Sequence, residues 1–136
     1  MKQFMIIETY GYIRISKSLY IELDHQIGKY LRKLFEFYTY KTIKLQRPSR
    51  QEHITIIREG FDLTPLLCYN GVKADFIIVG HATTNGNSIV FRVECPLGEQ
   101  IRKEFNYEAN NHFLHFCIGY LYEGHRKNST DGYSIC

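Results

Sequence analysis

The sequence contains no tryptophan, only three prolines and only four cysteines. It also lacks an apolar run of about 18 residues, the length at which a helix can cross a bilayer, so we expect no membrane-spanning helix. The cysteines are scattered, at Cys68, Cys95, Cys117 and Cys136, without a CxxC pair or the spacing of a zinc site. Because the apolar N-terminal run is too short for a signal peptide, we expect a cytoplasmic protein with reduced thiols.

The amino-acid composition is typical of one globular domain. Of the 136 residues, 44% are hydrophobic and 23% are charged, which suits a chain with a single core and is unlike a disordered one. The net charge of +3 is too small for a protein that coats nucleic acid. We therefore expect one domain over residues 1–136, with a loose polar tail at 124–136.

The apolar pattern predicts strands interrupted by two helices. Alternation and β-branched residues predict strands at 4–15, 53–58, 74–81, 88–95 and 113–122. A period of 3.6 residues predicts a helix over 18–38 with Ser18 as its N-cap, and a second over 96–106 beginning at Pro96. Turn residues predict a loop at 60–71. The predicted fold class is α+β, with one mixed sheet and two main helices on one face.

The predicted elements divide into two similar halves, at about residues 1–60 and 72–123. Each half has a strand, a helix and a second strand, and that second strand carries a histidine among apolar residues. This repetition predicts that the two histidine strands occupy equivalent positions in a duplicated fold.

The two histidine strands have the same pattern of side chains. One contains the sequence HITI beginning at His53, and the other contains HFCI beginning at His115. Because side chains alternate along a strand, His53 shares a face with Thr55, and His115 shares a face with Cys117. The apolar residues between them are expected in the core.

Two histidines, each beside a small polar side chain, are suited to phosphodiester cleavage without a metal ion. One imidazole can take a proton from the nucleophile while the other protonates the leaving oxygen. Hydrogen-bond donors at Thr55 and Cys117 can hold the non-bridging phosphate oxygens. With an unperturbed pKa of about 6.5, imidazole exists in both protonation states near neutral pH.

The HITI motif at His53 and the LHFCIG motif at Leu114 resemble the paired His-x-Ser/Thr motifs of the 2H phosphoesterase superfamily. That superfamily includes LigT-like RNA cyclic phosphodiesterases, 2′-5′ oligoadenylate phosphodiesterases and phage anti-CBASS nucleases. The resemblance covers most of the chain in layout, but it is carried by these two motifs. It implies a duplicated bilobal fold with a central cleft, and the short chain is most similar to compact phage members.

The resemblance also implies a reaction and the residues that perform it. The expected activity is hydrolysis, without cofactor or metal, of a small nucleotide: a cyclic oligonucleotide, a 2′-5′ oligoadenylate or a 2′,3′-cyclic phosphate, RNA ends included. His53 and His115 would form the acid/base pair, and Thr55 would bind phosphate. Cys117 stands where serine or threonine is expected, and a thiol is a weaker donor. A phage-encoded protein would act on an immune nucleotide signal in the host cytoplasm.

Four further residues are predicted to contact the substrate. Tyr12 and Arg14 share one face of the first predicted strand, and Arg58 ends the HITI strand. Tyr69 lies in the predicted loop, from which its ring can cover a nucleobase. These residue types supply the aromatic faces and the positive charge that nucleotides bind.

The small positive charge is concentrated beside the first motif. Residues 41–58 contain five basic residues and one acidic residue, Glu52. A short basic rim of this kind suits a small phosphorylated ligand better than a long nucleic acid.

Other interpretations use the same residues. The histidines can be structural residues hydrogen-bonded within their strands, and the chain can be a nucleotide- or RNA-binding module of the same fold, weakened by Cys117. His115 and Cys117 can also form a thiol enzyme site, although no third orienting group is evident. The HAT sequence at His81 runs into a turn and is interpreted as structural. His112 faces away from His115 on a strand, so no metal site is predicted.

Overall fold

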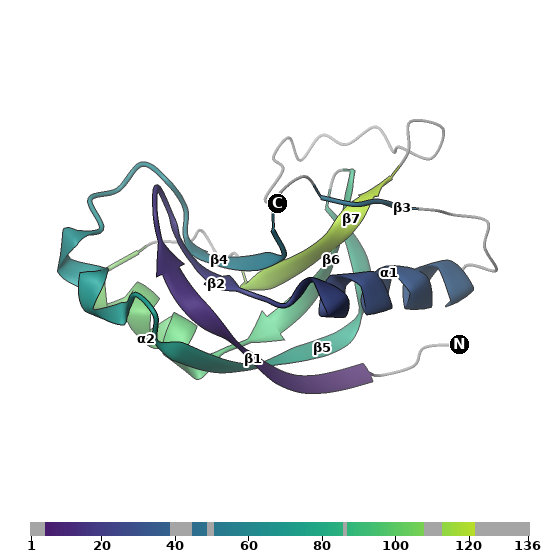
Figure 1. Ribbon diagram of the computed structural model, residues 1–136, viewed down its shortest axis with the longest axis horizontal. Coiled ribbons are helices and arrows are strands. Elements are labelled where there is room, and N and C mark those ends of the chain that lie inside the picture. The colour runs from purple at the N-terminus through teal and green to yellow at the C-terminus, as the bar shows by residue number, and fades with distance from the viewer. Residues whose placement is uncertain (1–4, 39–44, 49–50, 86, 108–112, 122–136) are drawn as a thin grey trace.

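A computed structural model describes residues 5–38, 45–48, 51–85, 87–107 and 113–121, which form one seven-stranded sheet and two α-helices (Figure 1). The strands are β1 (Met5–Ile15), β2 (Leu19–Glu22), β3 (Leu45–Gln46), β4 (His53–Ile57), β5 (Lys73–Asn85), β6 (Ser88–Glu94) and β7 (His115–Leu121). The helices are α1 (His25–Tyr38) and α2 (Pro96–Glu104), and a 3-10 helix, η1, spans Thr64–Tyr69. The predicted tail at 124–136 lies outside the described residues.

The strand order is β3-β7-β6-β5-β1-β2-β4, and each of these pairs is antiparallel. The predicted α+β class is confirmed, but the prediction of a mixed sheet is wrong. A parallel pair requires a crossover that returns the chain to the same end of the sheet. Here β6 and β7 pair antiparallel even though α2 lies between them in the chain.

The first predicted helix begins later than expected. Residues 19–22 form β2, and α1 begins only after Asp24, whose carboxylate accepts a hydrogen bond of 3.0 Å from the amide of Gln26. Ser18 precedes β2 and is not the N-cap. Apolar residues at 19, 21 and 23 alternate and are buried in the core, and β1 and β4 pair with residues 19–22 as strands on either side. Most of the other predicted elements are present with ends that differ by one or two residues, and η1 lies inside the predicted loop. β5 is longer than predicted and continues to Asn85, so the HAT sequence at His81 lies within a strand and does not run into a turn. β3 was not predicted.

One hydrophobic core fills the inner face of the sheet. The strands contribute alternate fully buried residues, and Leu31 of α1 and Ile101 of α2 join the same cluster. The sheet curves around this core, so that β4 and β7 contact each other although hydrogen bonds do not pair them (Figure 1). The curvature therefore brings the two histidine strands side by side. No helix among the described residues is long and apolar enough to cross a bilayer.

Gly11 leaves no room for a side chain between β1 and β2. A Cβ atom there would lie 2.5 Å from the backbone oxygen of Glu22 and 2.5 Å from Cγ2 of Ile21. We expect Gly11→Ala to lower the free energy of unfolding by about 1–3 kcal/mol, because the two strands must separate to admit the methyl group. Urea denaturation measures this.

Gly60→Ala provides the comparison for Gly11→Ala. Gly60 has a φ of +111°, but an added Cβ meets nothing within 4 Å. Its substitution should therefore cost only the backbone strain of about 1–2 kcal/mol. If Gly11→Ala leaves the urea midpoint unchanged, steric contact between β1 and β2 does not limit the packing.

Candidate active site

The histidine motif on β4 projects from the outer face of the sheet. Ile54 and Ile56 are fully buried in the core. Because side chains alternate, His53 and Thr55 lie on the opposite face. His53 is nevertheless only 8% exposed, whereas Thr55 is partly exposed.

The motif on β7 has the same arrangement. Phe116 and Ile118 are fully buried in the core, so His115 and Cys117 face outward. The strand register shows that the two motifs are on the same face of the sheet. Residues opposite each other on paired strands point to the same side, and these pairs can be followed across the sheet from His53 to His115. Since β4 and β7 also contact each other, the two motifs share the outer face of the sheet and lie on strands that are close in space.

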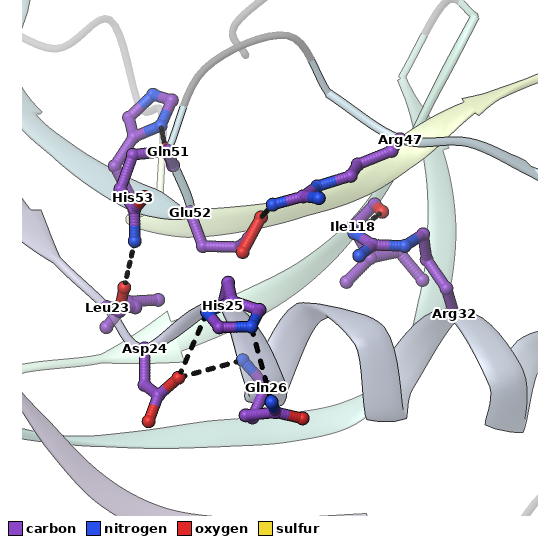
Figure 2. Close-up of polar contacts among 10 residues, drawn as sticks. All are labelled: Leu23, Asp24, His25, Gln26, Arg32, Arg47, Gln51, Glu52, His53 and Ile118. Carbon is purple, nitrogen blue, oxygen red and sulfur yellow. Dashed lines mark hydrogen bonds and ion pairs between the residues drawn. The ribbon is translucent and has the colours of Figure 1, made fainter.

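Both imidazole rings are anchored in the same way. Nδ1 of His53 lies 2.8 Å from the carbonyl oxygen of Gln51, and Nδ1 of His115 lies 3.1 Å from the carbonyl oxygen of Phe113 (Figure 2 shows the first). A carbonyl oxygen only accepts, so Nδ1 is the donor in each pair. In the neutral ring, Nε2 is then the nitrogen that can take up a proton. Both histidines therefore have the tautomer that a general base requires.

Each histidine has a neighbour that sequence reasoning missed. The ring of Tyr20 on β2 meets the ring of His53 edge to face, with centroids 5.9 Å apart, and Tyr20 lies opposite Thr55 in the register. Arg92 on β6 lies opposite His115, and its guanidinium is 4.0 Å from the ring centroid of Phe113. No local signal marks these two residues, because only strand pairing places them beside the motifs.

Two of the predicted substrate contacts share the face of His53. Tyr12 is opposite Glu22, which is opposite His53, so Tyr12 lies two strand spacings, or about 10 Å, from that histidine. Tyr12 is 42% exposed. Arg14, next to it on the same face, forms an ion pair of 3.9 Å with Glu22.

The other two predicted contacts lie elsewhere. Arg58 directly follows β4 and is exposed. Tyr69 is in η1, packs against the core, and donates a 2.6 Å hydrogen bond from its hydroxyl to Glu104 of α2. This hydrogen bond raises the pKa of Tyr69, because ionisation would place two negative oxygens together. The ring of Tyr69 is therefore held beside α2.

Cys117 is disulfide-bonded, whereas Cys68 and Cys95 are free. The expectation of reduced thiols is therefore wrong for Cys117. A disulfide sulfur has no proton, so in this state it cannot donate a hydrogen bond to phosphate or act as a thiolate. Burial raises the pKa of the Cys95 thiol, which caps α2 through the amide of Gly98.

A buried carboxylate lies directly before the first histidine. Glu52 is 2% exposed, and neither of its side-chain oxygens has a hydrogen-bond partner among the described residues. Its Oε1 is 3.7 Å from Nη2 of Arg47 (Figure 2). The one acidic residue of the predicted basic rim is therefore turned inward and paired with a rim arginine. The rim residues Lys41, Lys44 and Arg50 lie outside the described part of the chain.

No group of three or more histidine, cysteine, aspartate or glutamate residues within the described ranges is arranged to hold a metal ion. Comparison of the chain with protein-family models, curated proteins and solved structures found no match. The two motifs and their geometry are therefore the features of this chain that point to a function.

Proposed function

We propose that the protein is a phosphodiesterase of the 2H type that hydrolyses a small nucleotide without a metal ion. One observation carries the proposal. Two histidines lie on strands that contact each other, face the same side, and have Nδ1 donating to the carbonyl of the residue two positions earlier.

The chemistry requires one imidazole to begin neutral and the other to begin protonated. An oxygen nucleophile attacks phosphorus, and its proton passes to Nε2 of the neutral ring. We assign His53 as this base; the two histidines can exchange roles. The P–O bond to the leaving group breaks, and His115 gives its proton to the leaving oxygen. Thr55 lies on the same face as His53 and donates its hydroxyl to a non-bridging oxygen.

Positive charge beside His115 compensates for the donor that Cys117 does not supply. Arg92 pairs directly with His115 across β6 and β7. A guanidinium there can hold a phosphate oxygen in place of a second hydroxyl. The site thus has a hydroxyl on one side of the phosphate and a cation on the other.

The proposed substrate is a small nucleotide, because two tyrosines of the described residues lie close to His53 on its face of the sheet. Tyr20 and Tyr12 offer faces or edges for a base within two strands of the histidine. A cyclic oligonucleotide, a 2′-5′ oligoadenylate and a 2′,3′-cyclic phosphate end all fit this description. If the chain is encoded by a phage, the substrate is an immune nucleotide signal in the host cytoplasm. The proposed architecture is duplicated and bilobal, with one histidine from each half.

The proposal is tested by incubating the protein with a panel of cyclic and linear oligonucleotides in EDTA and identifying the products by mass spectrometry. We expect hydrolysis of at least one member with EDTA present. Activity that appears only when a divalent metal is added would assign the protein to another class. A ligand that binds but is never cleaved would favour the binding module, which the disulfide at Cys117 makes the second candidate.

Replacing Cys117 with threonine should keep or raise the hydrolysis rate. The substitution removes the disulfide and supplies the hydroxyl donor on the face of His115, so an increase of up to about tenfold is expected. Initial rates measure this, with Cys117→Val as the control that removes the sulfur without adding a donor. A threonine variant no more active than the valine variant would show that no donor acts at this position.

A further inference from the structure

The place where β4 and β7 meet is an unpaired seam between two strand edges. β4 is the last strand in the hydrogen-bonding order of the sheet. On the other side, β3 pairs with β7 only at Leu121 and Tyr120, so within the described residues the first part of β7 has no strand on that edge. Backbone carbonyls at such edges need donors from elsewhere.

Two arginines from the two helices supply these donors. Nη1 of Arg32 in α1 lies 2.9 Å from the carbonyl oxygen of Ile118 on β7 (Figure 2). Nε of Arg102 in α2 lies 2.8 Å from the carbonyl oxygen of Ile56 on β4. Both side chains are partly buried, and desolvation lowers the pKa of each guanidinium without discharging it. These are charge-assisted hydrogen bonds, which are stronger than those between neutral groups.

The two contacts are equivalent and they cross between the halves of the chain. Each acceptor stands three residues after the histidine of its strand: Ile56 after His53, and Ile118 after His115. α1 precedes β4 in the chain but reaches β7, whereas α2 precedes β7 but reaches β4. Each helix therefore braces the histidine strand of the opposite half.

We propose that Arg32 and Arg102 are positioning residues, with Arg32 setting the placement of His115 and Arg102 setting that of His53. Because the two strands are not joined by backbone hydrogen bonds, their spacing depends on side chains that span from the helices. A shift of about 1 Å between two catalytic groups can lower a rate about 100-fold. The catalytic part of this inference rests on the proposed phosphodiesterase function; the crossed placement of the strands does not.

The crossed pattern is testable without any substrate. In ¹H–¹⁵N spectra of the imidazoles, Arg102→Gln should shift the signals of His53 more than those of His115, and Arg32→Gln should do the reverse. Arg→Lys at the same sites keeps a charged donor and should give smaller shifts. Lys33→Gln and Lys103→Gln, which change exposed neighbours on the same helices, should leave both histidines unchanged.

The activity arm uses the same variants on whichever nucleotide the wild-type protein cleaves. We expect each Gln variant to lower kcat about 10–100-fold with little change in KM, and each Lys variant to recover part of that loss. If a Gln variant unfolds, the spectrum of the corresponding Lys variant shows whether that arginine positions the histidine of the opposite half. Shifts at the histidine of the same half, equal shifts at both histidines, or no shift at either would overturn the proposal. If the wild-type protein cleaves none of the nucleotides, the phosphodiesterase function is wrong. The spectra still show whether Arg32 and Arg102 position the two histidines.

Discussion

His53→Asn is expected to lower turnover by about 10²–10⁴-fold while leaving the protein folded. The amide nitrogen of asparagine can take the place of Nδ1 and donate to the Gln51 carbonyl, which Nδ1 of His53 contacts at 2.8 Å. The anchoring contact then persists, and only the basic nitrogen is lost. The same substitution at His115 preserves the contact with Phe113 and should have a loss of the same order.

The measurement is single-turnover hydrolysis, with thermal unfolding of each variant recorded in parallel. His25→Asn serves as the matched control, because His25 is exposed at the start of α1 and makes polar contacts with its chain neighbours Asp24 and Gln26. It should retain the wild-type rate. If both His53→Asn and His115→Asn hydrolyse at the wild-type rate, the acid/base mechanism is excluded.

Phe116→Ala is expected to have the largest effect on stability. Phe116 is fully buried on the core face of β7, between the outward-facing His115 and Cys117. Removing its ring leaves a cavity and loses the transfer free energy of the ring, which together cost about 3–5 kcal/mol. For a domain of this size we expect the unfolding midpoint to fall by roughly 10 °C or more.

Differential scanning calorimetry measures the loss, and Phe37→Ala is the control. Phe37 is a phenylalanine on α1 that is 67% exposed, so its truncation should change the free energy of unfolding by no more than about 0.5 kcal/mol. Together with His115→Asn, the pair separates the two faces of β7: the inner substitution should reduce stability and the outer one turnover. Equal stability losses for Phe116→Ala and Phe37→Ala would contradict the assigned burial.

The alternation of side chains was sufficient to predict both faces of the histidine strands. A strand has a side-chain period of two, so a single apolar face determines where every other residue points. That is why Ile54, Ile56, Phe116 and Ile118 were predicted in the core and are buried there. Pro96 likewise predicted the beginning of α2, because its ring suits the first turn of a helix.

The segment at 19–23 shows where such reasoning fails. Its apolar spacing fits the beginning of an amphipathic helix as well as a short strand, and the following residues are clearly helical. The sheet decides between them, since β1 and β4 supply hydrogen-bonding partners on both sides of β2. Tertiary pairing of this kind overrides local propensity.

By itself, the sequence determined the α+β class, the two histidine motifs and the side of each strand that enters the core. All of these follow from composition or from periods within a few neighbouring residues. Only the tertiary structure decided that the sheet is antiparallel and that Tyr20 and Arg92 lie beside the histidines. It alone placed Arg32 and Arg102 across the seam between β4 and β7. The reason is that strand order, register and curvature depend on contacts between residues far apart in the chain, which no local pattern encodes.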